Sequence, residues 1–126
     1  MTPTTPLLST LESYLNLTTR REQAISANMA NVDTPGYHTR DIDFDGELQR
    51  AMSGVLSQSE DGTGSVQINP VVREIPGLLE RPDGNNVSLD REGLLMAETQ
   101  LKYQVGIQLI KDQFHQILSA INGGGS

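Results

Sequence analysis

Two long stretches with apolar residues at helical spacing lie at the two ends of the chain. In the first stretch, Thr5 followed by Pro6 is typical of a helix start, and the pattern predicts a helix over residues 6–31. Thr18 and Glu22 fall on the apolar face, where burial would carry a cost unless each finds a polar partner. The face is therefore predicted to be an interface with polar positions. Its apolar members are Leu7, Leu11, Tyr14, Leu15, Ile25, Met29 and Val32.

The second stretch predicts a longer helix over residues 88–121. Ser88 is suited to cap it, and Asp90 and Glu92 place negative charge in its first turn, where the helix dipole favours it. The helix carries two opposed apolar faces. One consists of Leu89, Met96, Tyr103, Ile107, Ile110, Phe114, Ile117 and Ile121, and the other of Leu94, Ala97, Leu101, Val105 and Leu109.

Two opposed apolar faces indicate a helix that is covered on both sides. The first helix has one apolar stripe and can cover only one of them, so other subunits must supply the rest. We expect a mainly α fold in which the two terminal helices, ~40 and ~50 Å long, form an antiparallel coiled-coil-like hairpin. Gly93 and Gly106 each weaken the second helix by about 1 kcal/mol, or else permit close helix approach.

Residues 38–87 are expected to be irregular, with a small β element. Glycine and proline are frequent from residue 53 onward, and the apolar residues there suffice for two short strands. Those residues are Val66, Ile68, Val71, Val72 and Ile75. The chain thus divides into a helix and turn at 1–37, a middle segment at 38–87, a helix at 88–122 and a flexible tail at 123–126. The tail resembles an artificial linker.

The composition argues against several functional classes. Only 36% of the 126 residues are hydrophobic and 4% aromatic, which is little for a self-sufficient core. The net charge of −7 disfavours nucleic acid and anionic membranes. There is no cysteine, and the N-terminus has the features of neither a signal peptide nor a membrane anchor. If the chain is exported, we expect this to happen without cleavage of a signal.

The candidates for metal or catalytic chemistry are weak. Asp41, Asp43, Asp45 and Gly46 match the start of a calcium-binding EF-hand loop, but Met52 occupies the position where a glutamate should complete the site. The segment is therefore interpreted as a solvated acidic turn. His38 and His115 are far apart in sequence, and neither has a second metal ligand at a suitable spacing. No nucleophile or phosphate-loop motif is present, so we expect no enzyme activity and no cofactor.

The end of the first helix carries a specific motif. The turn at Thr34-Pro35-Gly36-Tyr37 has proline and glycine at the two central positions of a type II turn. In the preceding helical turn, Ala27 and Ala30 are small, and Asn28 and Asn31 can bond exposed carbonyls. The whole run 26–37, SANMANVDTPGY, resembles the N-terminal signature of the bacterial flagellar axial proteins, the rod and hook family.

Other segments resemble the proximal-rod members of that family. They are residues 39–44, residues 83–92 and residues 100–104. The resemblance implies a structural subunit of the proximal rod in the flagellar basal body, located in the periplasm-spanning part. It also implies export in an unfolded state through the flagellar type III apparatus. The implied partners are further copies of the chain, the rod-base protein FliE, the next rod protein FlgC and the export gate.

Assembly residues are assigned to the apolar faces of both helices. They are Leu7, Leu11, Leu15, Ile25 and Met29 on the first, and Leu101, Tyr103, Val105, Ile107, Ile110, Phe114, Ile117 and Ile121 on the second. Phe44 and Leu48 resemble the short aromatic and apolar motif by which early axial substrates meet the export gate. Three alternatives remain: another rod protein such as FlgC, a small dimeric helical adaptor with a coincidental turn motif, and a calcium-dependent binding protein.

Overall fold

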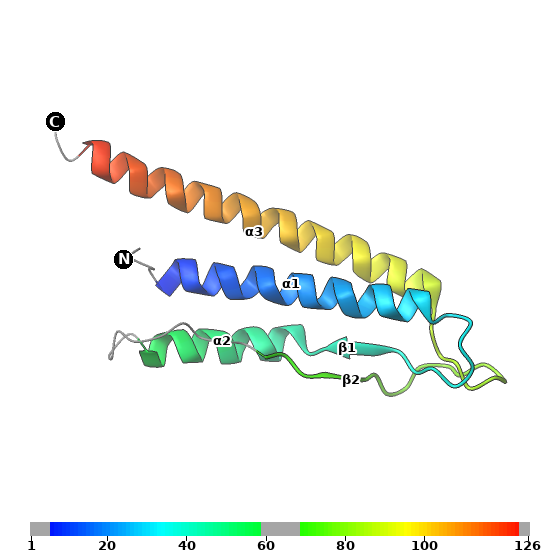
Figure 1. Cartoon of the computed structure of the whole chain (residues 1–126). Coiled ribbons are helices and arrows are strands. Elements are labelled where there is room, and N and C mark those ends of the chain that lie inside the picture. Colours follow the sequence, from blue (N-terminus) through cyan, green and yellow to red (C-terminus); the bar gives the residue numbers. More distant parts are fainter. Residues whose placement is uncertain (1–5, 59–68, 124–126) are drawn as a thin grey trace.

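Three helices and a two-stranded sheet make up the fold. The computed structural model describes residues 6–58 and 69–123. In chain order the elements are α1 (Pro6–Ala30), β1 (Arg40–Ile42), α2 (Phe44–Gln58), β2 (Val72–Glu74) and α3 (Leu89–Gly123). Helix α1 lies in the middle, with α3 on one side and α2 and the strands on the other (Figure 1). The predicted mainly α fold, with long terminal helices and a small sheet between them, is confirmed.

Helices α1 and α3 run antiparallel, as the sequence predicted (Figure 1). Asn28 near the end of α1 meets Glu92 near the start of α3, and Tyr14 and Leu15 lie close to Gly106. With 35 residues against 25, α3 is the longer helix, and its C-terminal end extends beyond the start of α1. The helix continues through Gly123, beyond the predicted helical pattern to residue 121 and the predicted segment end at 122, and residues 124–126 of the predicted tail lie outside the described residues.

The side of α3 that meets α1 is polar or small at its centre. Its buried members are Glu92, Thr99 and Gly106, which recur at heptad spacing. Thr99 satisfies its hydroxyl by donating to the carbonyl of Leu95 at 2.6 Å. A Cβ at Gly106 would lie 2.7 Å from Leu15 Cδ2, so this glycine permits the close approach that the sequence suggested.

This orientation decides which side of α3 points inward, which the two predicted apolar faces left open. Tyr103, Phe114 and Ile121, on the first of those faces, are 39%, 54% and 69% exposed. The helix is rotated so that the line through Glu92, Thr99 and Gly106 points inward, which leaves these larger side chains at the edge or beyond the end of α1.

Helix α1 is buried on two sides and not along one stripe. Besides the side that faces α3, a second side carries Leu17, which packs with Ile42 and Phe44 in the main hydrophobic cluster. The predicted apolar stripe was also wrong at its first position: Leu7 is 50% exposed, whereas its neighbour Leu8 is buried. The predicted polar position at Thr18 is fully buried, and its hydroxyl donates to the carbonyl of Leu15 at 2.7 Å.

The interpretation of residues 38–58 as irregular was wrong, since most of this segment is α2. Asp43 begins the helix: its carbonyl accepts a hydrogen bond from the amide of Glu47, and its Oδ1 one from the amide of Gly46. Asp45 and Glu47 lie in the first turn. The acidic cluster is therefore a helix start and not a solvated turn. Glycines at 46 and 54 obscured the helical pattern in the sequence.

The sheet pairs a strand before α2 with one after it. β1 and β2 are antiparallel, with Arg40 opposite Glu74 and Ile42 opposite Val72. Both strands were expected after residue 53, but only β2 lies there, and Val66 and Ile68 are outside the described residues. Asp41 of β1 is buried and forms an ion pair with Arg21 of α1 at 3.1 Å, which fixes the sheet to the helix.

Gly93 and Gly106 of α3 should respond oppositely to substitution. Gly106→Leu should lower the free energy of unfolding by about 1–3 kcal/mol, because the new side chain collides with Tyr14 and Leu15. Gly93→Ala should raise it by about 0.5–1 kcal/mol, since nothing lies within 4 Å of the added Cβ and alanine favours the helix. Denaturant unfolding followed by circular dichroism measures both. Equal effects of the two changes would contradict the close packing at Gly106.

Candidate assembly interface

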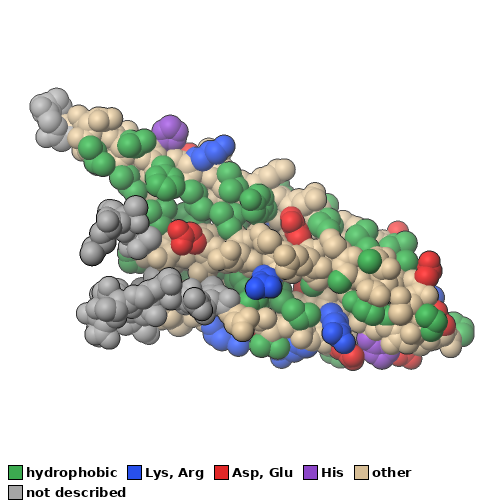
Figure 2. Space-filling view, in the orientation of Figure 1, with side chains coloured by type: hydrophobic (Ala, Val, Ile, Leu, Met, Phe, Trp, Pro, Cys, Tyr) green, Lys and Arg blue, Asp and Glu red, His purple; other side chains and the backbone are tan. Residues whose placement is uncertain are grey.

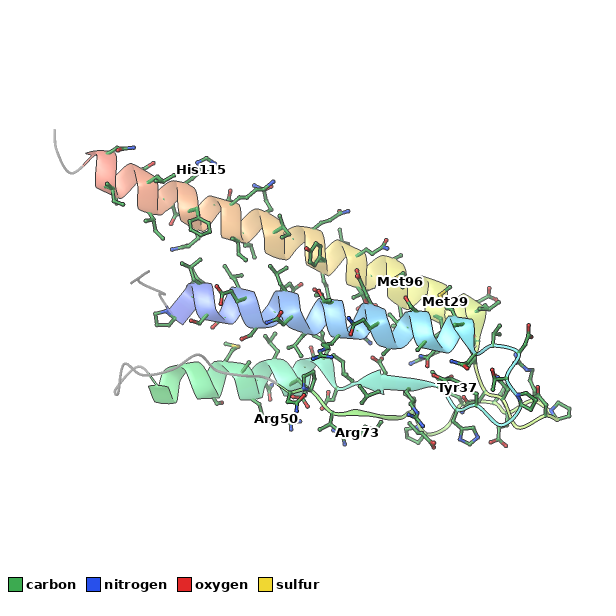
Figure 3. All side chains as sticks on the ribbon, in the orientation of Figure 1. Met29, Tyr37, Arg50, Arg73, Met96 and His115 are labelled. Carbon is green, nitrogen blue, oxygen red and sulfur yellow. The ribbon has the colours of Figure 1, made fainter. Side chains whose placement is uncertain are left out.

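The end of the hairpin where α1 stops is held by a network of buried polar side chains. We call this network the asparagine junction; it consists of Asn28, Asn85 and Asn86 with the groups that they bond. It joins three segments: the end of α1 with the following turn at 31–37, the start of β1, and residues 81–92. Figure 3 shows Tyr37 at this end of the molecule.

Asn28 of α1 uses all the hydrogen-bonding capacity of its amide. Its Nδ2 donates to the carbonyl of Arg40 at 2.8 Å and to Glu92 Oε2 at 3.0 Å. Its Oδ1 accepts from the amide of Arg40 and from the hydroxyl of Tyr37, each at 3.0 Å. Because two donors and two acceptors are all paired, burial of this side chain is compensated. One residue thus fixes α1 to β1, to the turn and to α3.

Glu92 is the partner of Asn28 on α3 and is fully buried. Its second oxygen, Oε1, accepts from the Arg91 guanidinium at 2.9 Å. The helix start is built as predicted, with the Ser88 Oγ accepting from the amide of Arg91 at 3.3 Å. A carboxylate in the first turn is favoured by the helix dipole, and its two partners offset the cost of burying it.

Asn85 and Arg81 bond carbonyls of the turn that follows α1. The Nδ2 of Asn85 donates to the carbonyls of Asn31 at 2.9 Å and Thr34 at 2.8 Å. The Arg81 guanidinium donates to the carbonyl of Val32. Both residues therefore tie the turn after α1 to a distant part of the chain.

Asn86 bonds the backbone on the other side of the turn. Its side-chain Oδ1 accepts from the backbone amide of Thr39 at 2.6 Å, and its backbone amide donates to the carbonyl of Tyr37 at 3.3 Å. The hydroxyl of Thr39 donates to the carbonyl of Asn86 at 3.3 Å. Both residues are buried, so these bonds form a short sheet-like link that water does not reach.

The predicted turn at residues 34–37 is confirmed. The amide of Tyr37 donates to the carbonyl of Thr34 at 3.2 Å, and Gly36 has a φ of 75°, as the second central position of a type II turn requires. The amide of Gly36 donates to the carbonyl of Asp83 at 2.9 Å. Gly84 also has a positive φ, and a Cβ there would lie 3.3 Å from the Gly36 Cα. The two loops therefore touch backbone to backbone.

The junction is held by hydrogen bonds and by the ion pair of Arg91 with Glu92. Within residues 6–58 and 69–123, no group of three or more His, Cys, Asp or Glu side chains could hold a metal ion. In the same residues, no helix is both long and apolar enough to cross a membrane. The acidic residues of the EF-hand match are used elsewhere: Asp41 pairs with Arg21, and Asp43 begins α2. What the junction does is hold the ends of α1 and α3 together.

The outer side of α3 is a second notable surface. Four large apolar side chains there form what we call the open α3 face: Leu94, Leu101, Val105 and Leu109, exposed by 71%, 61%, 47% and 48%. They belong to the second apolar face that the sequence predicted, and no described element covers them. Hydrophobic side chains also gather along the C-terminal half of α3 in Figure 2. An apolar surface of this kind is typical of a protein interaction site.

The residues predicted for assembly divide into two groups. One group packs inside the chain between α1 and its neighbours, and the other lies at the surface. The first contains the buried or half-buried Leu11, Leu15, Ile25, Met29, Ile107, Ile110 and Ile117. The exposed residues are Leu7, Leu101, Tyr103, Val105, Phe114 and Ile121. In the folded chain, this second group offers the larger accessible surface to another subunit.

The predicted gate motif lies inside the fold. Phe44 is 6% exposed and stacks edge to face on Tyr14, with 5.6 Å between ring centroids. The ammonium of Lys102, from α3, lies 4.5 Å from the Phe44 ring centroid. Leu48 packs against the same cluster. Partial burial of the Tyr14 phenol in this contact raises its pKa. Neither motif residue is presented to a partner in this conformation, and its role in export stays a prediction.

Sequence reasoning missed the residues that complete the junction. Asn85, Asn86 and Arg81 had no assigned role, and Glu92 was expected only as a favourable charge at the helix start. A signal was present, because two asparagines following Asp83-Gly84 are suited to bonding backbone groups in turns. Their partners are some fifty positions away in sequence, as the spacing of Asn85 and Asn31 shows, so local patterns could not reveal them.

Replacing the side-chain donor of Asn28 by an acceptor should show how much the junction stabilises the fold. Asn28→Asp keeps the side-chain shape but places a carboxylate oxygen against Glu92 and the Arg40 carbonyl, which are both acceptors. The free energy of unfolding should fall by about 2 kcal/mol or more at neutral pH. Glu92→Gln in the same chain should recover part of the loss, because its amide can donate to the new carboxylate. A double-mutant cycle of unfolding measurements without coupling would contradict the direct contact.

Comparison with known proteins places the chain in a family. No model of a known protein family matches it. The flagellar basal body rod protein FlgB of Salmonella typhimurium is 36% identical over 125 residues, with 90% of this chain and 91% of that protein aligned. The FlgB proteins of Yersinia ruckeri and Escherichia coli are 34% and 32% identical, with the same coverage. The chain therefore belongs to the FlgB family of flagellar basal body rod proteins.

Proposed function

We propose that the chain is a structural subunit of the proximal rod and that it binds neighbouring subunits through the open α3 face. The observation that carries this proposal is the orientation of α3, whose inward side is centred on Glu92, Thr99 and Gly106 while leucines point outward. A helix in a self-contained hairpin would turn its leucines inward. The outward leucines are explained if another subunit covers them.

The energetics support an interface on this face. Burying a fully exposed leucine or valine side chain contributes about 1.5–3 kcal/mol, and four such side chains line the face. Their partial exposure in the free chain reduces each contribution, but their sum still favours association with a complementary helix. The internal packing of α1 against α3 does not compete, because it uses the other side of the helix.

The proposal extends to the neighbours and to the route of export. We infer that copies of the chain contact one another in the rod, and that the rod-base protein FliE, the next rod protein FlgC and the export gate are further partners. Export is proposed to occur without cleavage of a signal peptide. Because Phe44 is buried against Tyr14, recognition of the Phe44 and Leu48 motif by the gate would require an unfolded chain. This supports export before folding.

A single charge on the open α3 face should separate assembly from folding. Leu101→Asp changes a side chain that is 61% exposed, so the helical circular dichroism signal should persist. Placing an unpaired charge in an apolar interface should remove swimming and the presence of the subunit in purified basal bodies. Secretion into the medium should continue, since the gate motif is unchanged.

Gln100→Asp provides the matched control. It introduces the same charge one position earlier, on an exposed polar position outside the four leucine and valine side chains. Swimming should remain close to that of the unaltered protein. Normal swimming and normal incorporation of the Leu101→Asp protein would contradict the proposed interface, as would a discrete, concentration-independent dimer of the unaltered chain in light scattering.

A further inference from the structure

A histidine is held between two carboxylates beside the asparagine junction. His38 directly follows the turn that ends at Tyr37. Its Nε2 lies 2.6 Å from Glu80 Oε1, and its Nδ1 lies 3.4 Å from Glu74 Oε2. Glu74 belongs to β2, and Glu80 lies beyond the bend that Pro76 and Gly77 form. One ring thus connects both flanks of residues 75–79 to the segment after the turn.

The number of protons on the ring decides how many of these contacts are favourable. A neutral imidazole has one N–H, so only one nitrogen can donate while the other presents a lone pair to a carboxylate. The imidazolium donates from both nitrogens and carries the opposite charge to its two partners. Donating to both carboxylates at once therefore requires the protonated ring.

The surrounding charges favour that protonated form. The pKa of His38 is raised above its ordinary value of 6.5, chiefly by the hydrogen bond with Glu74. Partial burial of the ring lowers it. The hydrogen bond with Glu80 and the negative charges of both glutamates raise it further. Three arginines lie near the two carboxylates. Arg81 donates to the carbonyls of Val32 and Val87, while Arg40 sits opposite Glu74 in the sheet and Arg73 sits opposite Asp41.

We propose that His38 is a proton-operated clip that fastens residues 76–80 to the turn of the asparagine junction in acid and releases them as the pH rises, while the Ile75 amide stays bonded to the Thr39 carbonyl. The clipped segment lies next to Arg81, which donates to the Val32 carbonyl after α1, and it carries Leu79, which is 94% exposed. Protonation therefore sets how firmly an apolar loop is held at one end of the hairpin. This inference does not depend on the assignment to the rod.

The sign of the pH dependence follows from the direction of the shift. A group whose pKa is raised by folding contributes its full stabilisation below its unfolded value and loses it as the pH rises through the folded value. The clip should therefore be closed below about pH 6.5 and should open above the folded pKa of His38. Both glutamates are more than half exposed at their side chains, so the effect should be local order and not global unfolding.

NMR of the full-length chain tests the clip. The ring signals of His38 should titrate with a pKa above 6.5, and the Glu74→Gln, Glu80→Gln double variant should lower that value. The {¹H}–¹⁵N heteronuclear NOE of the Leu78 and Leu79 amides should be higher at about pH 5 than at about pH 8. In the His38→Gln protein this difference should disappear.

His115→Gln is the control, because His115 lies on α3 and points away from α1 (Figure 3). It should leave both the titration of His38 and the loop measurement unchanged. A His38 pKa that is the same with and without the two glutamates would overturn the proposal. A loop whose pH response persists in the His38→Gln protein would overturn it as well, even if the chain still assembles into rods.

Discussion

The orientation of α3 depends on the buried hydrogen bond between Asn28 and Glu92. With Glu92 directed at α1, the residues at heptad spacing, Thr99 and Gly106, must also face α1. Leu94 and Leu101 are then directed outward, because they lie on the opposite side of the helix. A polar contact at one end thus decides which apolar residues are available along the rest of the helix.

The junction around this bond shows how a chain with a thin hydrophobic core can still hold a defined shape. Several of its fully buried side chains are polar, among them Asn28, Asn85 and Glu92. Each is paired with backbone or side-chain partners, so burial costs little, and the geometry of the bonds allows one arrangement of the loops. In this chain, specific hydrogen bonds fix the single arrangement of segments that larger domains obtain from apolar packing.

The polar and small residues between α1 and α3 also explain why apolar side chains remain exposed on the outer side of α3. The hydrophobic cluster of Leu17, Ile42 and Phe44 lies between α1 and the α2 side, while the α1–α3 contact is built around small and polar residues. The leucines and valine of the open α3 face are therefore not needed to fold the hairpin. A subunit of this kind can keep its internal contacts unchanged when neighbours cover that face.

The sequence by itself determined the two terminal helices, the Ser88 cap and the type II turn at residues 34–37. These features depend on residues close together in the chain, such as Pro35 and Gly36, whose backbone preferences act locally. The similarity of the turn region to the axial family likewise needed no structure.

Only the tertiary structure decided the rotation of α3, the second buried side of α1 and the roles of Asn85 and Asn86. Each depends on contacts between distant segments. The amphipathic pattern of α3 allows several orientations, and the bond from Asn28 to Glu92 selects one of them. Helix α2 was also missed, because glycines weaken its local preference and packing against α1 stabilises it. Local preference sets where helices form, whereas long-range contacts set which faces they bury.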